Sequence, residues 1–257
     1  MIASASSSFS SPRLKKLALA MMVLVALTLV AAALYQFAFV NPKFFSYAME
    51  LRAPRLIVML TAGFSISAAA IVFQTIIRNN IVTPCLLGMN SLYLLIHTAV
   101  VFFFGSGSQF ATNPVMAFAV DIVLMGVIAT FIYYSIFKKT GGNVLYVLLI
   151  GTVLSTFFSS MQNSLTRIMD PNEYDALLNT LVASFTNVNM ACIIPGILIL
   201  VLIALWLKKD IAILDIISLG RDQAISLGVD YERVLRRLMV GVALYIAVAT
   251  ALVGPLS

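Results

Sequence analysis

Long apolar runs that alternate with short polar segments are the feature that most constrains how this chain of 257 residues can fold. A helix needs about 20 apolar residues to cross the ~30 Å hydrocarbon core of a bilayer. Seven segments of the sequence meet or approach that length. We therefore predict an all-α integral membrane protein with transmembrane helices at residues 17–40, 56–77, 86–104, 114–137, 144–168, 190–207 and 238–256.

The composition supports the same class. Of all residues, 61% are hydrophobic and only 10% are charged, whereas a soluble domain carries about 25% charged residues. So few charges could not cover a soluble surface of this size, and lipid must therefore cover much of it. Cys85 and Cys192 both lie in apolar surroundings and predict no disulfide framework, and the sequence contains no metal-binding spacing.

The N-terminus predicts a retained helix. Residues 1–16 are serine-rich and then basic, and an apolar run of 24 residues follows. Because the apolar core of a signal peptide has about 7–15 residues, we expect a cytoplasmic tail at residues 1–16 and a permanent first helix. The remaining residues, 17–257, form the predicted transmembrane domain.

The basic residues predict the orientation of the chain. With the N-terminus in the cytoplasm, 12 of the 16 lysines and arginines fall on the inside, and only Lys43, Arg52, Arg55 and Arg167 fall outside. Cytoplasmic loops of membrane proteins carry an excess of such residues. The net charge of +6 is therefore a topology signal, and no nucleic-acid partner is needed to explain it.

Few residues could carry chemistry. His97 and Asp121 lie in apolar helices, where we expect packing or a hydrogen bond to a neighbouring helix, although an intramembrane acid is often functional. An ion-coupled secondary transporter or channel, with Asp121 as the coupling site, stays open as an alternative. We find no catalytic set and no ATP-binding glycine loop, so the chain predicts no enzyme and no cofactor, and any ATP must bind to another chain.

The helix at 144–168 carries small and hydroxylated residues at steps of four. Such spacing places them in two adjacent stripes on one face of a helix. Close packing against another helix and the lining of a wet pathway are both open, with Gln162 at the outer end slightly favouring a pathway. The candidate lining residues are Gly151, Ser155, Ser159, Thr152, Thr156 and Asn163.

Two polar segments suggest contacts with partners. In the inside loop 207–237, an amphipathic stretch at Asp222–Leu227 lies between Gly220 and Gly228, which predicts a short helix that is either a docking element or a connector. Outside, Arg52 and Arg55 place positive charge against the usual bias, which fits an acidic partner or lipid phosphates. Residues 170–189 predict a short helix at the membrane interface.

Four stretches together resemble the FecCD family of ABC importer permeases. They are LRAPRLIVMLTAGFSISAAAIVFQTIIRNNIVTPCLLGMN, LLIGTVLSTFFSSMQ, LDIISLGRDQAISLGVDYERV and VATALVGPLS, in the order that the family has them. The second of them resembles the family's G-x-x-x-S helix, and the third resembles its L-x-L-G-x-x-x-A-x-x-L-G-V cytoplasmic loop. Within the family, the sequence is most similar to permeases for catecholate-type ferric siderophores.

The resemblance implies a type II ABC importer fold that moves an iron chelate across the bacterial cytoplasmic membrane. It implies three protein partners: an ATP-binding subunit, an extracytoplasmic substrate-binding lipoprotein and a second permease subunit, identical or different. Arg52 and Arg55 would dock the binding protein. A coupling helix would contact the ATPase through Leu219, Gly220, Ala224, Leu227 and Gly228, and a cytoplasmic gate would lie at Thr140, Gly141, Gly142 and Asn143.

Two positions depart from the family pattern. The family's R-N-P reads R-N-N here, at Arg78, Asn79 and Asn80, and the sequence stops at Ser257. Family members have ten helices, so we expect about seven of them here, in a permease domain that is shortened at its C-terminus.

Overall fold

A computed structural model describes residues 12–38, 40, 42–80, 82–140, 144–178, 181–185 and 189–255. Every regular element in these ranges is a helix, as the apolar runs predict. The chain divides into two units, Met1–Leu56 and Ile57–Ser257. Helix α2 begins in the first unit and ends in the second, and each unit is described below by itself.

The first unit contains α1 (Pro12–Phe37), the short helix η1 (Pro42–Phe44) and the start of α2 (Phe45–Ile77). Helix α1 is apolar on every face, which suits a helix surrounded by lipid. The predicted start of the second helix at residue 56 is wrong, because α2 already begins at Phe45 and continues through Pro54. Arg52 and Arg55 therefore lie within a helix and not in a loop before it.

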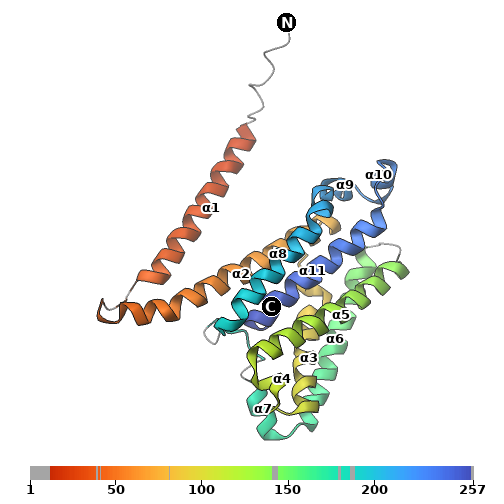
Figure 1. Cartoon of the computed structure of the whole chain (residues 1–257). Helices are drawn as coiled ribbons and strands as arrows, with labels where there is room; N and C mark the ends of the chain where they lie inside the picture. Colours follow the sequence, from red (N-terminus) through yellow and green to blue (C-terminus); the bar gives the residue numbers. More distant parts are fainter. Residues whose placement is uncertain are drawn as a thin grey trace. The chain divides into compact units, whose positions relative to one another are not determined.

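The second unit is a bundle formed by the rest of α2 and the helices that follow it (Figure 1). These are η2 (Pro84–Leu87), α3 (Met89–Phe104), α4 (Gln109–Thr112), α5 (Pro114–Thr140), α6 (Val144–Ile168), α7 (Pro171–Leu178), α8 (Met190–Ala212), α9 (Leu214–Ser218), α10 (Arg221–Ser226) and α11 (Tyr231–Val253).

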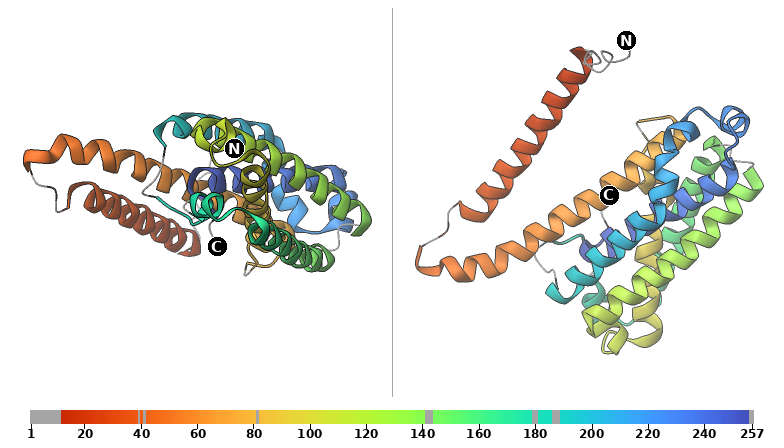
Figure 2. Two further views of the ribbon diagram at one scale, coloured as in Figure 1. Left: turned by 90° about the horizontal axis from the view of Figure 1, so that it is seen from below. Right: turned by 45° about the horizontal axis from the view of Figure 1, so that its top comes forward.

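Helix α11 is the most buried of the long helices and packs against α5, α8 and α3 (Figure 2). Small residues allow the close crossings. A Cβ at Gly241 would overlap the side chain of Leu207 on α8, and a Cβ at Gly126 on α5 would lie 3.0 Å from Leu244. The hydroxyl of Ser65 on α2 donates a 2.7 Å hydrogen bond to the Tyr245 carbonyl, which joins α2 to the same core.

The two ends of the bundle carry different short helices. Helices α9 and α10 lie at one end, and α4 and α7 lie together at the other (Figure 1). The predicted short helix after residue 170 is present as α7: Asp170 Oδ1 accepts a hydrogen bond from the Asn172 N–H at its start. Leu177 of α7 packs in a small apolar cluster with Val101 of α3.

Each of the seven predicted spans coincides with a helix. Among the described residues, five helices are long and apolar enough to cross a membrane: α1, α2, α5, α8 and α11. Helix α3 is apolar but has only 16 residues, and α6 is the more polar helix that its sequence indicates. Helix α8 runs on to Ala212 and α11 begins at Tyr231, so the non-spanning segment between them is shorter than the predicted loop 207–237.

Candidate functional site

The segment between α8 and α11 folds back as two short helices separated by glycine. Gly220 and Gly228 bracket α10 with φ angles of 107° and 80°, which residues with a Cβ rarely adopt. Ala224 N–H donates to the Gly220 carbonyl at 2.9 Å, and Val229 N–H donates to the Ala224 carbonyl at 3.0 Å. The short helix predicted at Asp222–Leu227 is thus present, displaced by one residue.

The two faces of α10 differ in burial. Ala224 is fully buried and lies in the bundle core, whereas three large apolar side chains on and beside α10 remain about half exposed or more: Leu219 (49%), Ile225 (50%) and Leu227 (61%). Ala224 therefore anchors the segment to the bundle, and an approaching partner would meet Leu219, Ile225 and Leu227. The sequence analysis did not name Ile225, which directly follows the buried Ala224 and so points about 100° away from it around the helix.

Ion pairs link the C-terminal end of α8, and also α10, to the first turns of α11. Arg237 Nε lies 3.1 Å from Asp210 Oδ2, a carboxylate that is almost fully buried, and the Arg237 guanidinium also lies over the Trp206 ring. Arg221 of α10 pairs with Glu232 of α11 at 3.1 Å on the surface. Arg237, whose side chain is 38% exposed, gives the buried Asp210 carboxylate an opposite charge, while the exposed pair adds little stability.

The two hydroxyl stripes of α6 have different surroundings. Ser155 and Ser159 hydrogen-bond to Ser91 of α3 at 2.9 and 3.1 Å, and Gly151 is buried. Gly88 approaches the α6 backbone so closely that a Cβ on it would lie 3.1 Å from the Ser155 Cα. Ser155 and Ser159 thus contact α3 and the residue before it, and Gly151 is buried within the bundle.

The second stripe faces outward. Thr152 and Thr156 are exposed, and their hydroxyls donate to carbonyls of their own helix, Leu149 and Thr152, at 2.8 and 3.0 Å. Asn163, which continues the first stripe one step beyond Ser159, is exposed as well. Hydroxyls bonded in this way can lie in an apolar environment without an unpaired donor. The predicted lining residues are therefore divided between a packed face and an open one.

Arg52 closes the end of α1 within the first unit. Its Nη1 donates to the carbonyls of Tyr35 and Ala38, both at 2.9 Å. A cation at this place neutralises the negative end of the helix dipole and satisfies carbonyls without an intrahelical partner. Arg55 is half-buried, and its side chain forms no ion pair or hydrogen bond with the part of the chain that the structure describes.

The predicted gate lies mostly outside the described residues. Gly141, Gly142 and Asn143 are not among them, and Thr140 is the last residue of α5, with a side chain that is not described.

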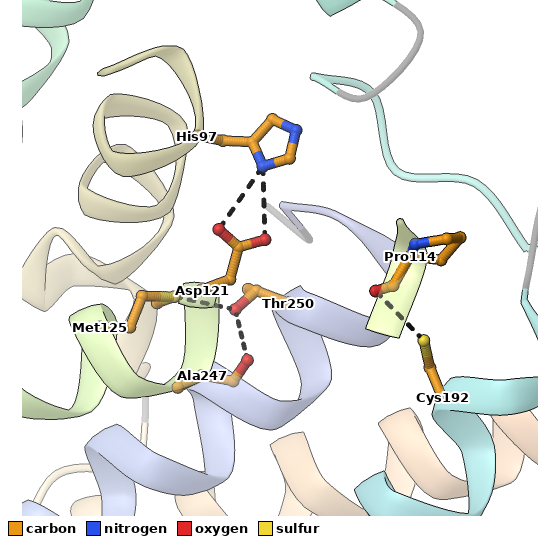
Figure 3. Close-up of polar contacts among 7 residues, drawn as sticks. All are labelled: His97, Pro114, Asp121, Met125, Cys192, Ala247 and Thr250. Atoms are coloured by element: carbon orange, nitrogen blue, oxygen red, sulfur yellow. Dashed lines mark hydrogen bonds and ion pairs between the residues drawn. The ribbon is translucent and has the colours of Figure 1, made fainter. Parts of the chain in front are cut away.

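A buried pair joins the two polar residues that the sequence left without partners. His97 Nδ1 of α3 lies 3.3 Å from Asp121 Oδ2 of α5, and their residues are 8% and 3% exposed (Figure 3). Both residues lie seven positions from the ends of α3 and α5 that are joined by the 105–113 connection. Equal depth on two antiparallel neighbours is the sequence signal that could have predicted the pair.

The pair borders a cavity of about 320 Å³. The backbone at Val182–Ser184 forms one wall, where Ser184 N–H donates to the Val253 carbonyl at 2.8 Å and Gly254 allows close approach to Ala183. Polar side chains in the lining are Tyr93, His97, Asp121, Ser184 and Asn189. Within the described residues, no group of three or more metal-ligating side chains is found, so this cavity offers no evident metal site.

Comparison with known proteins decides the family. The model of the FecCD transport family matches residues 16–257, which includes every motif noted above. The chain belongs to the FecCD transport family. The resemblance drawn from the four motifs is thereby confirmed.

Three relatives illustrate the membership. The chain is 34% identical over 234 residues to the petrobactin import system permease protein YclO of Bacillus subtilis strain 168, across 91% of this chain and 74% of that protein. It is 31% identical over 220 residues to the petrobactin import system permease protein FatC of Bacillus anthracis, across 84% and 61%. The iron(3+)-hydroxamate import system permease protein FhuG of B. subtilis is 27% identical, across 80% and 61%.

A solved structure has the same fold. A metal-chelate type ABC transporter in an inward-facing conformation superposes with a TM-score of 0.71 at 21% identity, over 92% of this chain and 75% of that one. This FecCD-family chain therefore has the transmembrane fold of a type II ABC importer and is a multi-pass membrane protein.

Proposed function

We propose that this chain is the permease subunit of an ATP-driven importer that carries an iron–siderophore chelate across the bacterial cytoplasmic membrane. Family membership and the permease relatives support the class of transporter. The names of those relatives, which import petrobactin or ferric hydroxamates, support an iron chelate as cargo. The chain itself would contribute no catalysis, and ATP hydrolysis would take place on a separate subunit.

The observation that carries this proposal is the geometry of α10. A short helix between two glycines of positive φ exposes Leu219, Ile225 and Leu227 and is held to the bundle by buried Ala224. Exposed apolar side chains on a firmly anchored element are typical of a docking surface. The ATPase would bind this surface, and its closure would move α10 against the bundle.

The open stripe of α6 would line the pathway. Thr152, Thr156 and Asn163 are exposed polar positions on a long helix, where exposure to lipid would be unfavourable for the Asn163 amide. A second permease subunit facing this stripe would enclose a path with polar walls. The gate at residues 140–143 would close the cytoplasmic end of that path, with the N-terminus also in the cytoplasm.

The outer surface would receive the substrate-binding protein. Arg55 has a side chain without a described partner, and it would contact an acidic group on the binding protein, with Arg52 beside it. Contacts between charged residues at the edge of an interface mainly set the rate of association and the orientation of the two partners.

The docking proposal can be tested by truncating the exposed face of α10. We expect the double variant Ile225→Ala and Leu227→Ala to weaken binding of the ATPase subunit roughly ten-fold or more, since truncated interface anchors cost over 1 kcal/mol each. The measurement is co-purification and titration of the ATPase subunit against the permease in detergent. Val201→Ala with Leu202→Ala is the matched control, because these exposed residues lie in the middle of α8. Equal ATPase affinity in both double variants would contradict the assignment of α10.

A further inference from the structure

The residue that follows α2 has an unusual backbone. Arg78 has φ of 56°, and it is the one non-glycine residue with positive φ in the described part of the chain. The Asn79 N–H donates to the Gln74 carbonyl at 3.2 Å, which closes the end of α2 in the way that usually requires glycine at the preceding position. Arginine is strained in this conformation, so contacts with the surrounding structure must hold it there.

The side chain of Arg78 covers Gly220 at the start of α10. A Cβ built on Gly220 would overlap Arg78 Nη2 and lie 2.9 Å from Cζ and 3.3 Å from Nη1, so the whole guanidinium faces this glycine. Gly220 is buried, and its φ of 107° also disfavours a side chain. The planar guanidinium of Arg78, at the end of α2, is thus in direct contact with the backbone of Gly220, at the start of α10.

The same junction includes the start of α11. Tyr231, the first residue of α11, is 6% exposed. Arg221 is the first residue of α10 and pairs with Glu232. The start of α10 is therefore linked to α11 by this ion pair and to the end of α2 by the Arg78 guanidinium.

We propose that Arg78 is a positioning residue that transmits movement of α10 to the end of α2. This inference rests on the proposed function, in which the ATPase acts on α10. A displacement of α10 would press Gly220 against the guanidinium, and the strained residue would pass that displacement to α2. Helix α2 is joined to the core through Ser65 and the Tyr245 carbonyl, so it can carry the movement into the bundle.

Two substitutions at Arg78 separate this role from simpler ones. Arg78→Gly removes the guanidinium but suits the positive φ, so it preserves or improves the end of α2. Arg78→Lys keeps a positive charge that could bind a lipid phosphate or an acidic partner, but it lacks the planar group that lies on Gly220. If Arg78 serves only to cap α2, Arg78→Gly keeps that function. If it serves only as a positive charge, Arg78→Lys keeps that function.

Gly220 and Gly228 supply a matched pair. Alanine is strained at both positions because both have positive φ, but a Cβ at Gly228 meets nothing within 4 Å. Gly220→Ala should therefore lower the thermal midpoint of the detergent-solubilised chain more than Gly228→Ala does. In an Arg78→Gly background the difference between the two alanine variants should shrink, because no guanidinium remains to be displaced and only the difference in backbone strain is left.

The deciding measurement is the number of ATP molecules hydrolysed per chelate imported. The assembled importer, with this chain, its ATPase and its binding protein, is reconstituted in liposomes and supplied with radioactive iron-loaded petrobactin. We expect Arg78→Gly, Arg78→Lys and Gly220→Ala to raise this ratio roughly five-fold, the lower end of typical coupling between sites. Gly63→Ala in α2, where a Cβ meets nothing within 4 Å, should leave the ratio near the wild-type value.

The outcomes are distinct. A wild-type ratio in Arg78→Gly would assign Arg78 to helix capping. A wild-type ratio in Arg78→Lys would assign it the role of a point charge. Either result overturns the inference while the proposed function stands. A wild-type complex whose uptake does not depend on ATP would overturn the proposed function and this inference with it. Raised ratios with unchanged thermal midpoint in Arg78→Gly would support it.

Discussion

His97 and Asp121 show how a single contact changes the meaning of two residues. Each is costly in an apolar helix when considered alone, but at 3.3 Å each supplies the partner that the other needs. The His97 ring also stacks on Tyr93, with centroids 5.7 Å apart, so its orientation is restricted. A structural pair thus accounts for both residues without an ion-coupled transport mechanism.

We expect His97→Ala to destabilise the chain by about 3 kcal/mol, because it leaves the Asp121 carboxylate buried without its partner. The double variant with Asp121→Ala should lose less than the sum of the single changes. Denaturation in detergent, followed by helical circular dichroism, measures both. Thr98→Val is the control, since the hydroxyl of this fully buried neighbour has no hydrogen-bond partner among the described residues, and its removal should cost little.

Uptake measurements test the alternative at the same residue. If Asp121 bound a coupling ion, Asp121→Asn would abolish import while ATP hydrolysis by the complex continued. We expect instead that any loss of import follows the loss of folded protein.

The two outer arginines are expected to differ. Arg52 is engaged with the end of α1, so Arg52→Glu should lower both the thermal midpoint and the affinity for the binding protein. Arg55→Glu should weaken binding-protein association without lowering the midpoint. The association should also depend on salt, because exposed charges are screened over about 10 Å at 0.1 M ionic strength. Unchanged affinity in Arg55→Glu at low salt would leave Arg55 as a lipid anchor.

At the scale of the element, α6 carries one stripe of residues that packs against other helices and a neighbouring stripe that is exposed. Ser155 is in contact with Gly88 and Ser91, whereas Thr156, one residue later, is exposed. Adjacent positions on a helix point about 100° apart, so neighbouring stripes can face a partner helix and the outside. The spacing of the hydroxyls alone does not say which stripe faces which way.

We expect Ser155→Leu to destabilise the bundle by about 1–3 kcal/mol, because a larger side chain overfills a close helix crossing. Thr156→Leu should leave the thermal midpoint unchanged but reduce uptake if the open stripe lines the pathway. Thermal unfolding in detergent and uptake by the assembled importer measure the two effects separately. Full uptake in a stable Thr156→Leu variant would contradict the lining assignment.

At the scale of the whole molecule, the chain is built from membrane-spanning helices, and the two ends of its second unit carry different short helices. The short helices α9 and α10 mark one end of the second unit, and α4 and α7 mark the other. From the excess of lysine and arginine we expect the α10 end to face the cytoplasm.

Labelling of single cysteines tests that orientation. In a background with Cys85 and Cys192 replaced by serine, Ser226→Cys on α10 should react with an impermeant maleimide only from the cytoplasm, and Arg167→Cys only from outside. Replacement of Cys85 is a precaution, since burial raises the pKa of its thiol and already slows its reaction at neutral pH. Labelling of Ser226→Cys in intact cells would reverse the assigned topology.

The sequence alone was sufficient for the existence and order of the seven predicted helices and for the family. Apolar runs of membrane length have one stable solution in lipid, because every backbone polar group must be satisfied within its own helix. The same reasoning located α10 to within one residue, since its glycines interrupt the helices on either side. Helix ends were less certain: Pro54 and the charges around it resemble a loop, yet α2 continues through them.

Only the tertiary structure decided which faces meet. It paired His97 with Asp121, turned Ala224 inward and Leu227 outward, directed Ser155 toward α3 and placed the Arg78 guanidinium on Gly220. These facts depend on how helices rotate and cross, which is set by the packing of many side chains at once. Spacing along one helix is a local property, whereas a contact between residues 78 and 220 exists only when the whole bundle has formed.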